Sequence, residues 1–152
     1  MGRWKDGRGT LVVRGAAAGT RADGAQADSA RTDRARTDHA RTDSARTDGD
    51  GAAGIPLEIA ASYRARTKGL LGRDGVEGAL LLSPANSVHT FRMRFAIDVA
   101  YLNRDLEVIA VRTMRPGRLG LPRPRSRYVL EAEAGAMAGW GVGPGARLSV
   151  ET

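Results

Sequence analysis

The sequence of 152 residues contains no cysteine, so disulfide bridges, thiolate metal sites and cysteine nucleophiles are excluded. It also lacks any run of about 18 apolar residues, the length that spans a membrane as a helix. No apolar stretch follows the charged N-terminus as it would in a secretory signal. We therefore expect a cytoplasmic protein without membrane insertion.

Large apolar side chains are missing from residues 15–54, which contain no Val, Ile, Leu, Met, Phe, Trp or Tyr. Such a segment cannot bury enough surface to offset the entropy lost on ordering. Within it, residues 31–50 repeat Arg-Thr-Asp every five residues, a period that forms no stripe on a helix. We expect a disordered, low-complexity insertion at 15–54, between an N-terminal tail with a first strand at 1–14 and a β-rich domain at 55–152.

Histidine is scarce as well, since His89 is the only histidine in residues 55–152. One histidine with scattered carboxylates identifies neither a catalytic triad nor a complete set of metal ligands. We expect no metal site and no cofactor. Because His39 belongs to the repeat tract, we assign it no role of its own.

Short apolar runs separated by turn residues indicate strands. The expected strands are 10–14, 55–60, 79–84, 88–101, 106–111, 128–131 and 146–150. Helix signals occur only at 63–71, after the N-cap candidate Ser62, and at 133–140. The pattern predicts a mainly β protein, a compact β-sandwich or barrel-like domain with two short helices and no parallel βαβ unit.

The longest alternation of apolar and polar residues runs through 88–101 and predicts one long strand with two distinct faces. His89 falls in phase with the apolar side chains. The opposite side, called the polar face below, carries Thr90, Arg92, Arg94 and Asp98. Aliphatic neighbours flank Asp98, so we expect it to be partly buried and held by an arginine or by backbone N–H groups. The candidate ligand-binding residues are His89, Thr90, Arg92, Arg94, Asp98 and Glu131.

The net charge is +7, and residues 112–127 are rich in arginine. Arginine matches carboxylate and phosphate groups, which makes this loop a candidate anion site. Its members are Arg115, Arg118, Arg123 and Arg125. Codon use in a GC-rich genome explains the same abundance, and basic charge alone is weak support. Only two Phe, three Tyr and two Trp are present, which counts against single-stranded nucleic acid as the partner.

Four segments in order resemble a known bacterial and archaeal family, domain of unknown function 192. They are Gly69–Arg73, Val88–Leu102, Val129–Glu131 with Ala134-Gly135, and Gly141-Val142 with Gly145. The resemblance covers residues 55–152 and the strand at 10–14. It implies a compact β-sandwich or barrel-like fold with short helices, and no established activity. The sequence departs from the family where glycine is common, at Arg92 and Leu106, and where proline is usual, at Ala96.

The favoured hypothesis is a non-enzymatic binding or accessory module. It would present the polar face, or the arginine-rich loop, to an anionic small molecule or a protein partner. The first alternative is an enzyme of unassigned reaction with a pocket around His89, Asp98 and Glu131. The second is a weak RNA-binding protein that acts through residues 112–127.

Overall fold

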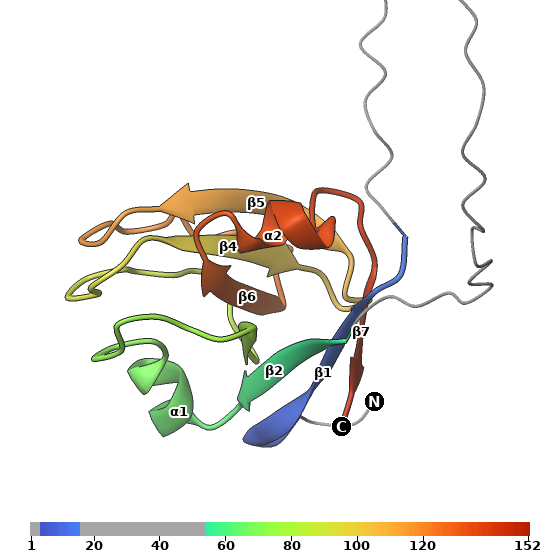
Figure 1. The fold of residues 1–152 in the computed structure, drawn as a ribbon, viewed down its shortest axis with the longest axis horizontal. Helices are drawn as coiled ribbons and strands as arrows, with labels where there is room; N and C mark the ends of the chain where they lie inside the picture. The colour runs from blue at the N-terminus through green and yellow to red at the C-terminus, as the bar shows by residue number, and fades with distance from the viewer. Residues whose placement is uncertain (1–3, 16–53) are drawn as a thin grey trace, which may run out of the picture. The chain divides into compact units, whose positions relative to one another are not determined.

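The computed structural model describes residues 4–15 and 54–152, which form one seven-stranded sheet and two short helices (Figure 1). The strands are β1 (Gly7–Val13), β2 (Ile55–Ala60), β3 (Ala79–Leu82), β4 (Ile97–Leu102), β5 (Val108–Met114), β6 (Tyr128–Glu133) and β7 (Leu148–Glu151). The helices are α1 (Tyr63–Lys68) and α2 (Ala136–Trp140). The predicted mainly β fold with two short helices is confirmed. The insertion expected at 15–54 lies almost wholly outside the described residues.

The strand order in the sheet is β5-β4-β6-β3-β2-β1-β7. Strands β1 and β2, which flank the repeat tract in the sequence, are antiparallel neighbours. Strands β2 and β3 pair in parallel, and α1 lies in the connection between them. The expectation of no parallel βαβ unit was therefore wrong. Alternation within a strand does not report the direction of its neighbour, and residues 61–78 are long enough for a crossover.

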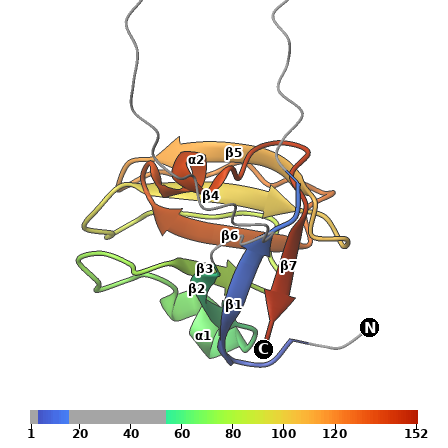
Figure 2. The same cartoon turned by 45° about the vertical axis from the view of Figure 1, so that its right-hand side comes forward.

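The two edge strands of the sheet meet at one end, which curls the sheet into a half-open barrel (Figure 2). The backbone N–H of Val108 donates to the carbonyl of Ala146 at 2.8 Å, and the N–H of Gly145 donates to the carbonyl of Val108 at 2.8 Å. These bonds join the start of β5 to the segment that enters β7. Within the described part of the chain, the rest of β5 is an open edge of the sheet.

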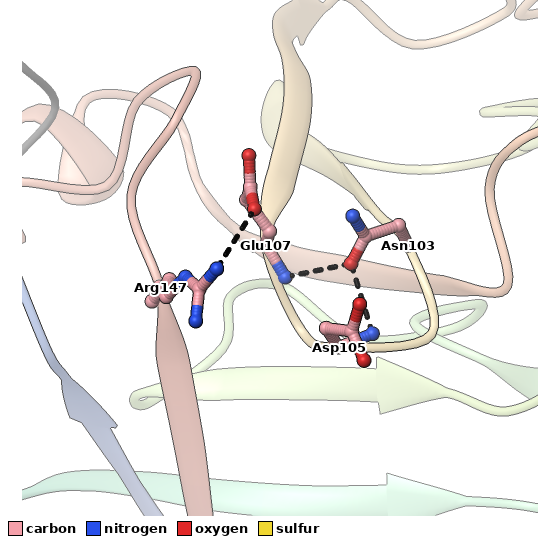
Figure 3. Close-up of polar contacts among 4 residues, drawn as sticks. All are labelled: Asn103, Asp105, Glu107 and Arg147. Carbon is pink, nitrogen blue, oxygen red and sulfur yellow. Dashed lines mark hydrogen bonds and ion pairs between the residues drawn. The ribbon is translucent and has the colours of Figure 1, made fainter.

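Asn103 fixes the hairpin between β4 and β5 (Figure 3). Its Oδ1 accepts hydrogen bonds from the backbone N–H of Asp105 at 2.9 Å and of Glu107 at 3.0 Å. Glu107 in turn lies 3.7 Å from the guanidinium of Arg147, across the junction of the two edge strands. A turn thus lies between the strands expected at 88–101 and 106–111, and its side-chain contacts align the strand that follows.

Each face of the sheet carries its own hydrophobic cluster. On the face covered by α2, called the α2 face, the cluster includes Leu57, Leu81, Leu102, Leu130 and Met137. The opposite face, called the α1 face, is covered by α1 and by the loops that follow α1 and β3. Its cluster includes Leu70, Leu80, Leu82, Val88, Met93, Val99 and Val129. Because both faces are covered, the polar side chains Asp98 and Glu131, which point from central strands, are buried.

The helices begin and end close to where the sequence places them. Ser62 caps α1 as predicted, because its Oγ accepts a hydrogen bond from the N–H of Ala65 at 3.1 Å. Helix α1 stops before Gly69, earlier than expected. Helix α2 starts after Gly135, later than expected, because Glu133 is still part of β6.

Only the last part of the long strand predicted at 88–101 is a strand, namely β4, and residues 88–96 lie outside any named strand. Thr90 accounts for the difference. It is fully buried, its hydroxyl donates to the carbonyl of Arg115 at 2.6 Å, and its Oγ1 accepts from the N–H of Arg118 at 2.9 Å. Long-range contacts of this kind override a local alternation that would otherwise favour a strand.

Arg92 and Leu106 both have left-handed backbones, with φ of +59° and +58°. This region disfavours side chains by about 1–2 kcal/mol relative to the right-handed one. We expect Arg92→Gly to stabilise the protein by about 0.5–1 kcal/mol, because glycine relieves the strain but loses more entropy on folding. Urea denaturation measures the change. Arg104→Gly is the control, since Arg104 has no positive φ and should lose stability. A less stable Arg92→Gly would contradict the argument.

Candidate functional site

Glu131 is a buried acid in the middle of the sheet. It lies on β6, opposite Leu80 of β3 and Val99 of β4, so its side chain points to the α1 face. The residue is only 4% exposed although its neighbours on that face are apolar. The strand therefore holds a carboxylate inside a hydrophobic layer.

A cavity of about 80 Å³, called the Glu131 pocket, lies over this carboxylate. Its lining comes from α1 and the loop after it, from the end of β3, from the loop after β3, and from β6. The residues are Arg66, Thr67, Lys68, Gly69, Leu70, Leu71, Leu82, Ser87, Val88, His89, Met93 and Glu131. Six of these twelve residues are polar or charged, and the others are Gly69 and apolar side chains such as Leu70, Leu82 and Val88.

Gly69 brings the backbone close to this carboxylate. Its φ of +43° suits glycine, and a Cβ built on it would lie 4.0 Å from Oε2 of Glu131. The N–H of Gly69 donates to the carbonyl of Ala65 at 2.9 Å, so it is not directed at the acid. The turn after α1 thus closes one side of the pocket without supplying a donor to Glu131.

Burial raises the pKa of Glu131 from 4.5 to about 7, and desolvation is the only cause. Among the described residues, no side chain or backbone group forms a hydrogen bond or an ion pair with this carboxylate. Arg66 lines the same pocket, but its guanidinium donates to the carbonyl of Pro84 at 2.7 Å. A perturbed acid in a cavity with no partner is typical of a functional site.

His89 is exposed and lies at the edge of the Glu131 pocket, where its ring stacks on Phe91 with 5.2 Å between ring centroids. His89 was expected in phase with the apolar side chains of one long strand, but it is exposed, and Phe91 beside it is 46% exposed. His89 and Glu131 therefore line one pocket, whereas the enzyme hypothesis required Asp98 there as well. Sequence reasoning did not identify residues 66–71 as part of the pocket. No pattern in so short a helix shows which part of the sheet the helix and the loop after it will cover.

Asp98 is not part of this pocket. It neighbours Val99 on β4 and so points to the opposite, α2 face. Its carboxylate accepts hydrogen bonds from Thr113 Oγ1 at 2.7 Å, from Gly135 N–H at 2.8 Å and from Met137 N–H at 3.3 Å. Asp98 is 4% exposed and joins β5 and the start of α2 to β4. The expected burial and the backbone donors are present, and a hydroxyl takes the place of an arginine.

The polar face predicted from the sequence does not form, because residues 88–96 are not a strand. Thr90 is buried under the loop at 115–118, and Asp98 lies beneath α2. Arg92 is exposed, and Arg94 forms an exposed ion pair with Asp74 at 3.0 Å. Such surface pairs contribute little to stability. The structure therefore does not bring these four residues together on one face of a strand.

Three of the four candidate anion-binding arginines do come together. Arg115, Arg118 and Arg123 line one groove beside β5, whereas Arg125 is exposed outside its lining.

Within residues 4–15 and 54–152, no group of three or more His, Cys, Asp or Glu side chains could hold a metal ion. Among the described helices, none has the length and apolar character needed to cross a membrane.

Fold and site together define a half-open β-barrel domain with a small pocket around one buried carboxylate. The chain belongs to the DUF192 family, described as an uncharacterised ACR family, whose model matches residues 44–150. It is 37% identical to a UPF0127 protein of Pyrococcus furiosus, over 62% of this chain and 85% of that protein. It is 31% identical to a UPF0127 protein of Pyrococcus horikoshii, over 52% of this chain and 73% of that protein.

Two solved structures share the fold. A protein of unknown function from Novosphingobium aromaticivorans matches with a TM-score of 0.56 and 20% identity, over 66% of this chain and 79% of that chain. A putative transcription regulator from Sinorhizobium meliloti matches with a TM-score of 0.63 and 16% identity, over 98% of each chain. Three of the segments that carry the family resemblance contribute to the Glu131 pocket, namely 69–73, 88–102 and 129–131.

Proposed function

We propose that the protein is a binding module that holds a small, positively charged head group of a ligand in the Glu131 pocket. One observation carries the proposal: the Glu131 carboxylate is buried at the wall of a cavity and has no partner among the described residues. A buried charge without a partner destabilises a fold by several kcal/mol. A cation from a ligand would supply the partner that the fold does not.

An alkylammonium group suits the chemistry of this pocket. Its carbon atoms would contact the aliphatic walls while its N–H groups donate to Glu131. At about 80 Å³ the cavity admits only a few heavy atoms, so the rest of a larger ligand would lie outside. Lys68 and His89, which are exposed at the edge of the lining, favour an outer part that carries negative charge. A small zwitterion with its amine directed inward meets both conditions.

Methylammonium is the simplest probe of this site. We expect it to bind only when Glu131 is ionised, so its affinity should rise about tenfold from about pH 6 to about pH 8, on either side of a pKa near 7. Binding should also lower the pKa of Glu131. Titrations followed by NMR of ¹³C-labelled glutamate carboxyl groups measure both effects.

Glu131→Gln should abolish methylammonium binding, because it removes the charge and keeps the size. Glu133→Gln is the matched control, since Glu133 is an exposed acid two residues along the same strand. Sodium chloride and methanol control for ionic strength and for a neutral head group. Binding that survives in Glu131→Gln, or that weakens as the pH rises, would overturn the proposal.

The raised pKa of Glu131 favours a second candidate function, an enzyme in which this residue transfers a proton. General acids and bases work best with a pKa near the working pH, and burial brings this one to about 7. Incubation with a mixture of amino acids, followed by mass spectrometry, separates the two functions. Conversion that requires Glu131 supports the enzyme, whereas recovery of unchanged bound ligand supports the binding module.

This proposal keeps the binding module expected from the sequence and moves its site. The polar face is replaced by the Glu131 pocket, because Thr90, Arg94 and Asp98 are engaged in contacts within the fold. A cytoplasmic location remains a prediction from the sequence. Cell fractionation of the full chain would test it.

A further inference from the structure

A second concave surface lies beside β5 and shares no lining residue with the Glu131 pocket. It is a groove of about 450 Å³ between the end of β5 and the loop at 118–123. The residues that give it its character are Arg112, Arg115, Arg118, Arg123, Leu119 and Leu121. We call it the arginine groove.

The charge of the arginine groove is uncompensated. Its lining contains no Asp or Glu, and none of its four arginines is ion-paired with a carboxylate in residues 4–15 and 54–152. The Arg123 guanidinium is held over the ring of Tyr101, 4.8 Å from its centroid. Within that described part, the Nε of Arg123 is buried without a hydrogen-bond partner. The contact with Tyr101 thus fixes the Arg123 side chain at the wall of the groove.

Strand β5 is at the edge of the sheet, as Figure 1 shows. It pairs with β4 on one side, and among the residues that the structure describes its other side is bonded only near Val108, by Ala146 and Gly145. The part that borders the groove, Arg112–Met114, therefore presents an open strand edge. Open edges accept an additional extended strand through backbone hydrogen bonds.

Apolar side chains accompany the charge. Leu119 is 69% exposed and Leu121 is 80% exposed, whereas Tyr101 is the only aromatic residue of the groove and is 2% exposed. Single-stranded nucleic acids need accessible aromatic rings for stacking, so this lining does not suit them. A polypeptide that combines carboxylates with aliphatic side chains does suit it.

We propose that the arginine groove binds an extended acidic segment of a partner protein, which adds a strand to the open edge of β5. Glutamate or aspartate side chains of the segment pair with the arginines, and its aliphatic side chains cover Leu119 and Leu121. In an extended segment successive side chains point to opposite sides. An alternating acidic and aliphatic sequence is therefore the matching pattern.

The probe is a short fluorescent peptide in which glutamate and valine alternate. Its binding to the full chain is measured by fluorescence anisotropy. We expect saturable binding that weakens as salt rises from about 50 to about 200 mM, because salt screens exposed charges. A peptide that alternates lysine and valine should not bind. A version methylated on backbone nitrogens should bind about tenfold more weakly or not at all, because strand addition needs those N–H groups.

Charge reversal tests the surface directly. Arg115→Glu with Arg118→Glu should weaken the acidic peptide by about tenfold or more, since it places like charges together. The matched control is Arg64→Glu with Arg104→Glu, two exposed arginines outside the groove, which should leave binding nearly unchanged. Equal loss in both double variants would show nonspecific attraction and overturn the proposal. So would tighter binding of a polyuridine RNA, or of vesicles with anionic lipids, than of the peptide.

Discussion

Replacing Glu131 by glutamine should stabilise the protein, and the gain should grow by about 2–3 kcal/mol between about pH 5 and about pH 8. In the folded chain burial raises the pKa of Glu131 from 4.5 to about 7. The folded state therefore binds more protons than the unfolded state between these two values. Stability contributed by this group is greatest below about pH 4.5, falls as the pH rises through 7, and is constant above that.

Glutamine does not ionise, so the variant escapes this loss and its stability advantage appears only as the pH rises. Urea denaturation of both proteins at several pH values measures the difference, and the contributions of all other acids cancel in the comparison. Glu58→Gln is an informative control, because Arg73 hydrogen-bonds Glu58 at 2.8 Å and holds the pKa of that carboxyl below its usual range. That control should lose stability at high pH.

A destabilised Glu131→Gln at every pH would mean that the carboxylate has a partner within the fold. That outcome would remove the basis of the proposed ligand site. If Glu131→Gln is more stable and binds no methylammonium, the result supports the proposed ligand site, since binding residues are often retained at the expense of stability.

Asp98→Asn should lower the free energy of unfolding by about 1–3 kcal/mol, with a larger loss for Asp98→Ala. The carboxylate accepts a hydrogen bond from Thr113 Oγ1 and two from the backbone N–H groups of Gly135 and Met137. Asparagine keeps the shape but loses the charge that strengthens these bonds. Alanine leaves two N–H groups without their acceptor at the start of α2.

The matched control is Asp74→Asn, which removes only the exposed ion pair with Arg94 and should change stability by less than about 0.5 kcal/mol. Hydrogen exchange at the Met137 amide should accelerate in both Asp98 variants, because that N–H loses its acceptor in Asp98→Ala and keeps only an uncharged, weaker one in Asp98→Asn. Unchanged stability and exchange in Asp98→Asn would show that Asp98 serves something other than the attachment of α2.

Local sequence patterns correctly predicted an element wherever the interactions that form it join residues close together in the sequence. The alternation of Ile55, Leu57 and Ile59 predicts β2, the Asn103 turn predicts the hairpin, and Ser62 predicts the start of α1. Each depends on side-chain periodicity or on a hydrogen bond to a near neighbour in the chain.

Local patterns failed where distant segments decide the structure. Thr90 is held by the loop at 115–118, so the alternation around it produced a false strand. The parallel pairing of β2 with β3 depends on the path of the whole connection. The pocket likewise depends on how residues 66–71 and 87–93 cover the α1 face.

The sequence by itself determined that the chain is mainly β, where most of its strands lie, and that Asp98 and Glu131 are acids among apolar residues. Only the tertiary structure decided what each acid does. The register places Glu131 opposite Val99 and Ala132 opposite Asp98. Because neighbouring residues of a strand point to opposite faces, Asp98 meets the backbone donors of α2 whereas Glu131 faces a cavity. That register depends on strand pairing across the sheet, which no segment of the sequence specifies alone.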